Sequence, residues 1–181
     1  TLAVKRQSDA NAVAVIEAAT GRVTASIPAG HTAMGPAIAP DGKRLYVCNR
    51  FDDDVSVIDL ASGTEVARVD ALREPVAAAI SPDGKTVFAG NHLPKSKTGF
   101  PFSSPVAAAL TAIDARTLET TTILLPHGSH SLRDLCPSGD GKQLYVTHLL
   151  ANFELTPTQV EMGWMHINAI SIVAIEQRKL V

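Results

Sequence analysis

Histidine is the residue of this sequence best suited to chemistry, because imidazole both binds metal ions and titrates near neutral pH. Two of the six histidines lie together in the segment His127-Gly128-Ser129-His130. This spacing predicts a metal site or an acid–base site formed by His127 and His130. The alternative is that both rings hydrogen-bond the local backbone, because an HxxH pair outside a helix is a weak motif.

No other motif specifies a reaction, so the catalytic residues stay unknown and the chain is not expected to be an enzyme by itself. The sequence contains no GxSxG, HExxH, P-loop or dinucleotide fingerprint. Cys48 and Cys136 form no CxxC or CxxCH motif, which excludes covalent haem within this chain, and we expect two buried free thiols. The one cofactor predicted is therefore a metal ion at His127 and His130.

Charge and hydropathy exclude two classes of partner. The chain has 16 basic and 18 acidic residues, a formal net charge of -2, so it offers no field for nucleic acid. No apolar run reaches the roughly 18 residues that cross a bilayer, and the first residues do not resemble a signal peptide. We therefore expect neither nucleic acid nor a membrane span.

The elements that position the histidines follow from an internal repeat. Val13-Ala14-Val15-Ile16-Glu17 returns as Val55-Ser56-Val57-Ile58-Asp59, and Pro40-Asp41-Gly42-Lys43 returns as Pro82-Asp83-Gly84-Lys85. Both pairs are 42 residues apart, within the period of roughly 40 to 45 residues that is typical of propeller blades. Short β-rich runs joined by Asp-Gly turns predict four strands in each repeat.

We therefore predict an all-β fold, a β-propeller made of four-stranded antiparallel blades, of which this chain covers about four blades of a larger ring. The whole chain, 1–181, is expected to be a single partial propeller. The expected units are a partial blade at 1–27, a blade at 33–70, a blade at 75–125 with an insertion at 92–105, and an incomplete blade at 131–181 with an insertion at 149–168.

The repeat resembles the YVTN type of β-propeller repeat. Leu45-Tyr46-Val47-Cys48-Asn49 follows a Pro-Asp-Gly-Lys turn, and Leu144-Tyr145-Val146-Thr147-His148 is a second copy with His in place of the final Asn. The resemblance implies a mostly exported bacterial or archaeal protein, often seven-bladed, of the surface-layer or cytochrome-associated branch. It therefore implies an extracytoplasmic location, whether periplasmic, secreted or on the cell surface.

Strand direction assigns the unusual residues to one face of the disc. Strands of a blade alternate in direction, so the first-to-second and third-to-fourth turns share one face, and the longer connections share the other. The histidines and most large aromatic residues map to the second face. The ligand- or partner-binding residues expected there are His31, Arg73, His92, Phe100, Phe102, Arg133, His148, Phe153, Trp164 and His166.

These observations lead to two functional hypotheses. The first is an exported or surface-exposed binding scaffold that uses its loop-rich face to dock a protein or polymer partner, or the remaining blades of its own ring. The alternative is the propeller part of a redox or metal-dependent enzyme, associated with a haem-containing domain or subunit. The insertion from Thr147 to Met165 resembles one in YVTN propellers joined to di-haem peroxidase-like domains.

Overall fold

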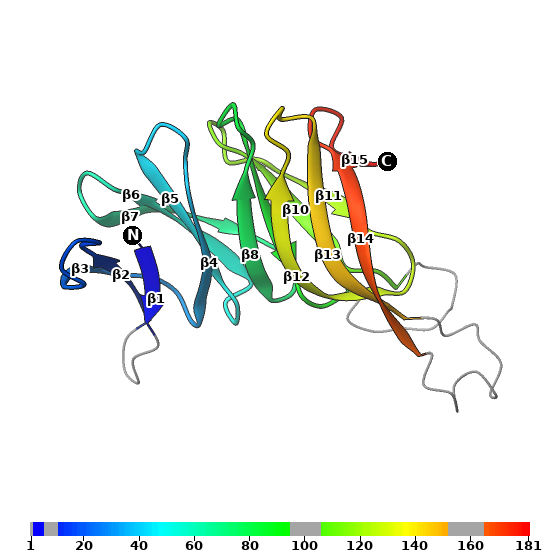
Figure 1. Ribbon diagram of the computed structural model, residues 1–181, viewed down its shortest axis with the longest axis horizontal. Coiled ribbons are helices and arrows are strands. Elements are labelled where there is room, and N and C mark those ends of the chain that lie inside the picture. The colour runs from blue at the N-terminus through cyan, green and yellow to red at the C-terminus, as the bar shows by residue number, and fades with distance from the viewer. Residues whose placement is uncertain (1, 6–10, 95–105, 152–164) are drawn as a thin grey trace.

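The computed structural model describes residues 2–5, 11–94, 106–151 and 165–181. Four of the expected binding residues, Phe100, Phe102, Phe153 and Trp164, lie outside these ranges, as do parts of both predicted insertions. Within them the fold is all-β and consists of four antiparallel sheets (Figure 1). None of the described segments forms a helix long and apolar enough to cross a membrane.

Each sheet is a meander of strands that are consecutive in sequence, and we call the sheets blades A to D. Blade A contains β1 (Leu2–Lys5), β2 (Ala12–Ile16) and β3 (Val23–Pro28). Blade B contains β4 (Ala33–Ile38), β5 (Arg44–Asn49), β6 (Asp54–Asp59) and β7 (Thr64–Asp70). Blade C contains β8 (Pro75–Ile80), β9 (Thr86–Asn91), β10 (Ala109–Asp114) and β11 (Thr120–Leu124). Blade D contains β12 (Ser129–Pro137), β13 (Gln143–Ala151), β14 (His166–Ala174) and β15 (Lys179–Leu180).

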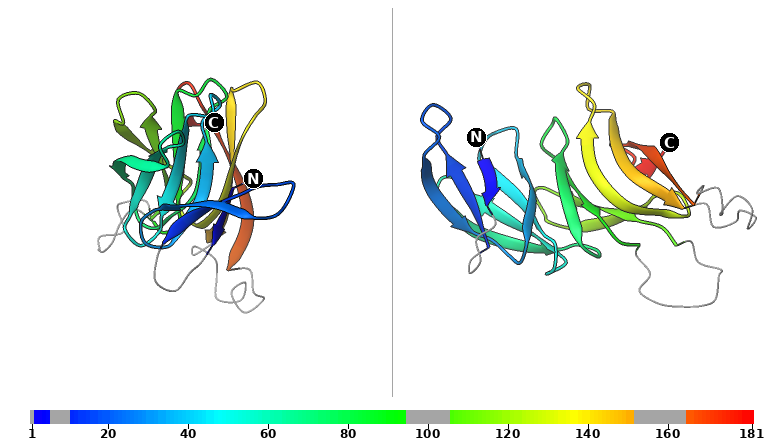
Figure 2. Two further views of the ribbon diagram at one scale, coloured as in Figure 1. Left: turned by 90° about the vertical axis from the view of Figure 1, so that its left-hand side faces the viewer. Right: turned by 60° about the horizontal axis from the view of Figure 1, so that its bottom comes forward.

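The blades pack side by side, with their first strands adjacent. Strand β8 contacts both β4 and β12, so the first strands of blades B, C and D form an inner layer (Figure 2). Small side chains such as Ala77 and Ala79 suit this crowded layer. The arrangement is that of a β-propeller and confirms the predicted fold class.

The hydrophobic core lies between neighbouring blades. Along β5, Leu45 and Val47 pack with Val13 and Ile27 of blade A, whereas Tyr46 belongs to the cluster with Val87 of blade C. A third cluster joins Phe88 of blade C to residues of blade D such as Leu132 and Leu144. Successive residues of a strand point to opposite faces of the sheet, so the central blades B and C bury both of their faces, whereas Tyr145 and Ile170 of blade D are exposed.

Two faces of the propeller differ in their connections. The turn face holds the first-to-second and third-to-fourth turns of blades B, C and D, and the Asp-Gly turns there place Gly42 and Gly84 at φ of 71° and 73°. Glycine adopts this left-handed conformation without steric cost. The loop face, on the opposite side, holds the second-to-third connections and the crossovers between blades; it lies at the bottom of Figure 1.

Candidate functional site on the loop face

Two histidines of blade D meet on the loop face. The Nε2 atom of His130 lies 3.0 Å from the Nδ1 atom of His166, and the two rings are edge to face with centroids 4.9 Å apart. His130 is the second residue of β12 and His166 the first residue of β14, and both strands pair with β13. The register of β13 therefore joins two residues that are 36 positions apart in the sequence.

Burial and neighbouring charge favour the neutral form of the His130 ring. Its pKa is lowered first by desolvation, then by the charge of His166, and further by His92, His148 and Arg133. The Nδ1 atom of His130 lies 2.9 Å from the Ser131 hydroxyl. Two proton arrangements satisfy these contacts: in the first, His130 Nδ1 donates to Ser131 and its Nε2 accepts the Nδ1 proton of His166; in the second, Ser131 donates to His130, and His130 donates to His166. In the first arrangement the Nε2 lone pair of His166 points away from this bond, and no described residue bonds to it.

A bulge in β12 shapes the surroundings of this pair. The register of β12 against β13 shifts between His130 and Asp134, and Ser131 has a φ of 49°. Arg133, inside the bulge, is exposed, while Leu132 is buried against blade C. Bulges redirect side chains in this way. The main chain of the bulge also binds His92, whose Nδ1 lies 3.3 Å from the carbonyl oxygen of Leu132.

His148 corrects the expectation that it contributes to the exposed loop face. Its side chain is only 2% exposed. Nδ1 lies 3.0 Å from the carbonyl oxygen of Leu149, and Nε2 lies 2.8 Å from the hydroxyl of Ser171 on β14. Both ring nitrogens are thus used inside blade D, because the side chain of His148 points into the blade and not toward solvent. A charge on the buried His148 ring lowers the pKa of His130 through the interior of blade D.

The predicted pair of His127 and His130 has a different geometry from the one expected. His127 is exposed, and its Nδ1 accepts a hydrogen bond of 3.1 Å from the backbone N–H of Val106. His130 instead directs its Nε2 to His166. Among the described residues, no group of three or more His, Cys, Asp or Glu side chains is arranged to hold a metal ion. A metal ion bound by His127 and His130 stays a prediction.

His31 and Arg73 lie in a second part of the loop face, at the crossovers of blades A, B and C. The ring of His31 packs on Phe51 with centroids 5.4 Å apart, and Arg50 lies over Phe51 at 5.1 Å from the ring centroid. Arg50 also forms an ion pair of 2.7 Å with Glu74. Arg73 donates to the carbonyl oxygen of Pro94 over 3.2 Å. The structure thus divides the predicted face into two groups of residues.

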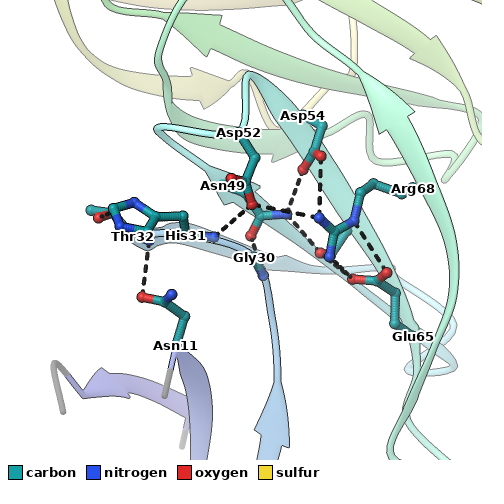
Figure 3. A network of polar contacts seen from close by, with 10 residues as sticks. Asn11, Gly30, His31, Thr32, Asn49, Asp52, Asp54, Glu65 and Arg68 are labelled. Atoms are coloured by element: carbon teal, nitrogen blue, oxygen red, sulfur yellow. Dashed lines mark hydrogen bonds and ion pairs between the residues drawn. The ribbon is translucent and has the colours of Figure 1, made fainter. Parts of the chain in front are cut away.

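A buried polar network fixes the crossover that carries His31 (Figure 3). Asn49 accepts a hydrogen bond of 2.9 Å from the backbone N–H of Gly30 and donates to Asp54 and Ser56 over 2.6 and 2.7 Å. Asp52 accepts the N–H of His31 over 2.7 Å. The Asn of the repeat therefore attaches the crossover to the second strand of the blade, and Asn91 accepts the N–H of Leu72 in the same way.

The aspartate run at 52–54 and one ion pair have structural roles that no motif in the sequence indicates. Asp52, Asp53 and Asp54 each accept a hydrogen bond from the protein, with Asp53 bound to the N–H of Glu74 over 2.7 Å. The 42-residue repeat could have predicted these contacts, because folding the repeat into blades places each of these aspartates next to a crossover. Arg50 and Glu74 gave no local signal, since they are 24 residues apart.

The two cysteines are both free, but they differ in exposure. Cys48 is buried in the cluster between blades B and C, as expected, and burial raises its pKa to about 12. The expectation that Cys136 is buried is wrong, because Cys136 is exposed. It alternates with the buried Leu135 along the inner strand β12, and its side chain points away from the core.

Comparison with known proteins places this fold in a family. The sequence profile of the cytochrome D1 heme domain matches residues 2–124. The chain belongs to the cytochrome D1 heme domain family. It is a family of eight-bladed β-propellers, whereas the repeat resemblance implied seven blades. The finer assignment to YVTN-type repeats stays a prediction.

A solved structure with the same fold is hydrazine synthase from Kuenenia stuttgartiensis. The two chains are 24% identical, with a TM-score of 0.53. The match covers 90% of this chain but only 56% of the hydrazine synthase chain, so this chain spans little more than half of that protein. At this level of identity the likeness shows the β-propeller fold alone. No curated protein sequence matches the chain.

Proposed function

We propose that this propeller is the haem-associated part of a redox protein, and that a haem group or a haem-carrying domain contacts its loop face beside His130 and His166. The observation that carries the proposal is the 3.0 Å contact between these two rings; with the Nδ1 proton of His166 donated to His130, the Nε2 lone pair of the exposed His166 is free for a ligand. Membership of the cytochrome D1 heme domain family supports a haem-related role for the fold.

The residues of this face fit a haem group in their chemistry. Haem iron is commonly held by a neutral imidazole, and His166 offers one whose second nitrogen is hydrogen-bonded. Arg133 is exposed in the same cluster and supplies a guanidinium, the group best matched to carboxylates such as haem propionates. When bound, haem supplies one-electron and ligand-binding chemistry at its iron.

The chain's own residues then have distinct roles. His166 would ligate, whereas His130 is a positioning residue that accepts the His166 Nδ1 proton and fixes the orientation of that ring. In this arrangement the Ser131 hydroxyl, 2.9 Å from Nδ1 of His130, would accept the other ring proton of His130. His92 fixes the bulge of β12 from the neighbouring blade. Arg133 would orient an anionic group at the edge of the cluster.

The experiment is an absorption spectrum of the full-length protein isolated from the organism that makes it, followed by titration of the recombinant chain with haemin. We expect a haem band in the full-length protein and saturable haemin binding by the chain. His166→Ala should abolish the ligation-specific band, and His130→Ala should shift it. His127→Ala is the matched control, because His127 is equally exposed but bonds elsewhere.

Three results would overturn the proposal. The first is a full-length protein without haem and without a haem-carrying partner. The second is a haemin spectrum that is the same in the wild type and in His166→Ala. The third is a spectrum that changes in His127→Ala but not in His166→Ala, which would favour the HxxH pair instead.

A docking role at the second part of the loop face is a further candidate. Phe51 is 56% exposed and lies between the His31 ring and the Arg50 guanidinium, a combination of aromatic and cation that protein interfaces favour. We propose that this group docks a protein or polymer partner and that the protein is extracytoplasmic. Protease treatment of intact cells tests the location; a protein that stays uncut until the cells are lysed would contradict surface exposure.

A further inference from the structure

The turn face, on the opposite side from the histidines, contains a cavity of about 820 Å³ between blades B and C. Its walls come from the β4–β5 turn of blade B and from the β8–β9 and β10–β11 turns of blade C. Cavities of roughly 300 to 1,000 Å³ are typical of sites for small molecules. This cavity has no part in the proposed haem function.

Four basic side chains line the cavity: Lys43, Arg44, Lys85 and Arg116. Arg44 donates from one terminal nitrogen to the carbonyl oxygen of Ala115 over 2.8 Å, which fixes the guanidinium across the blade interface. Neither the Lys43 ammonium nor the Arg116 guanidinium has an ion pair or side-chain hydrogen bond with any described residue. The cavity therefore presents cationic donors that are available to a ligand.

Three aspartates also line the cavity, but their carboxylates are engaged by their own turns. Asp41 accepts the N–H of Lys43 over 3.0 Å. Asp83 accepts the Ser81 hydroxyl and the N–H of Lys85 over 2.6 and 3.0 Å. Asp114 accepts the N–H groups of Arg116 and Thr117 over 2.9 and 2.8 Å. Asp83 also pairs with the Lys85 ammonium over 3.3 Å, so the basic side chains left for a ligand are Lys43, Arg44 and Arg116.

Tyr46 provides a polar group inside the cavity. Its side chain is only 1% exposed, yet it lines the cavity. The Tyr46 hydroxyl has no hydrogen-bond partner among the described residues, whereas every fully buried polar side-chain atom of these residues has one. The hydroxyl is therefore not fully buried. The hydroxyl therefore touches the cavity and is free to bond to a ligand there.

The equivalent position between blades C and D is built differently. The cavity there is about 530 Å³ and is lined by two basic side chains, Lys85 and Arg178, and four acidic ones. Phe88, which is 42 residues after Tyr46, is buried and does not line it. Of these two cavities, only the one between blades B and C has more basic than acidic side chains and a free hydroxyl.

We propose that the cavity between blades B and C binds a small polyvalent oxyanion, a phosphate ester or a polycarboxylate. Lys43, Arg44 and Arg116 contact its charged groups, because a guanidinium pairs with phosphate and carboxylate oxygens in a bidentate manner. The Tyr46 hydroxyl donates to an oxygen of the ligand inside the cavity. The apolar side chains of Ala39 and Pro40 cover the rest of the ligand.

Isothermal titration calorimetry at low salt tests this site, with pyrophosphate and citrate as separate probes. We expect saturable binding of one equivalent of at least one probe, and the tighter of the two identifies the phosphate or carboxylate class. Tyr46→Phe should weaken binding about tenfold, the effect of losing a hydrogen bond to a charged group. This variant should fold, because Phe88 occupies the same position of the next repeat.

Arg116→Gln and Lys142→Gln form a matched pair of charge variants. Arg116 lines the cavity, whereas Lys142 follows the β12–β13 turn of blade D, the counterpart of the turn that precedes Lys43, and lines neither cavity. We expect Arg116→Gln to weaken binding by about fivefold or more and Lys142→Gln to leave it unchanged within about twofold. The proposal is overturned if neither probe binds saturably, if Tyr46→Phe binds as the wild type does, or if both charge variants weaken binding equally.

Discussion

The Nε2 atom of His130 lies 3.0 Å from the Nδ1 atom of His166, so two blade strands that are not neighbours in the sheet are linked by one imidazole–imidazole hydrogen bond. The bond needs at least one neutral ring, and burial together with the charge of His166 lowers the pKa of His130. The same relationship determines how the loop face should respond to acid.

Acid should destabilise the protein through His130. Because the pKa of His130 is lower in the folded chain, the unfolded chain binds more protons at this residue once the pH falls below about 6.5, the ordinary value. The free energy of unfolding should therefore fall as the pH drops, and His130→Asn should lose less stability between about pH 7.5 and about pH 5 than the wild type does. Urea denaturation at a series of pH values measures this, and equal losses in both proteins would contradict it.

Only one of the two thiols should react in the folded protein. Burial raises the pKa of Cys48 to about 12, so its reactive thiolate is absent at neutral pH, whereas Cys136 is exposed. A thiol reagent such as DTNB should modify one equivalent in native buffer and two in denaturant. Cys136→Ser should remove the native reaction, and Cys48→Ser should not. Rapid modification of both thiols in native buffer would contradict the position of Cys48 in the core.

Asn49→Ala should destabilise blade B strongly. The change removes the hydrogen bonds of the Asn49 side chain to the Gly30 N–H, to Asp54 and to Ser56. These buried groups then lose Asn49 as a hydrogen-bond partner. The expected loss is about 2–3 kcal/mol in the free energy of unfolding. Asn168→Ala is the control, because Asn168 is exposed on β14 and should change stability by less than about 0.5 kcal/mol. Similar losses in both variants would show that the network does not fix the crossover.

Gly35→Ala tests the close packing of blades B and C. Gly35 has a φ of 51°, and a Cβ atom there would lie 2.7 Å from the backbone Cα of Ala77 on β8. Strain and overlap should together cost about 2–4 kcal/mol. Gly139→Ala provides the comparison, since nothing lies within 4 Å of its added Cβ atom. Thermal unfolding of both variants measures the difference, and a Gly35→Ala protein as stable as the wild type would contradict the close approach.

The fold could be predicted from the sequence because its signals are local and repeated. Asp41-Gly42 and Asp83-Gly84 mark the same turn in two blades, and the recurrence of Val13–Glu17 at Val55–Asp59 sets the period of the blades. Regular strand alternation then assigns the histidines to the loop connections. These inferences need only the geometry of antiparallel strands.

The details of the candidate site could not be predicted in this way. His127 and His130 are close in sequence, but the partner of His130 is His166, which is brought near by the register of β13 with β14. The β12 bulge that exposes Arg133 has no local sequence signature. His148 replaces the repeat Asn and was therefore expected at the loop face, although its side chain points into blade D. Each of these depends on tertiary register and not on local pattern.

The central claim is that the loop face of this propeller is the haem-associated face. Anomalous scattering at the iron absorption edge, measured on crystals of the full-length protein isolated from its source, locates any iron directly. We predict an iron peak on the loop face next to His166. An iron peak on the turn face, or the absence of iron from both the full-length protein and its bound partners, would contradict the claim.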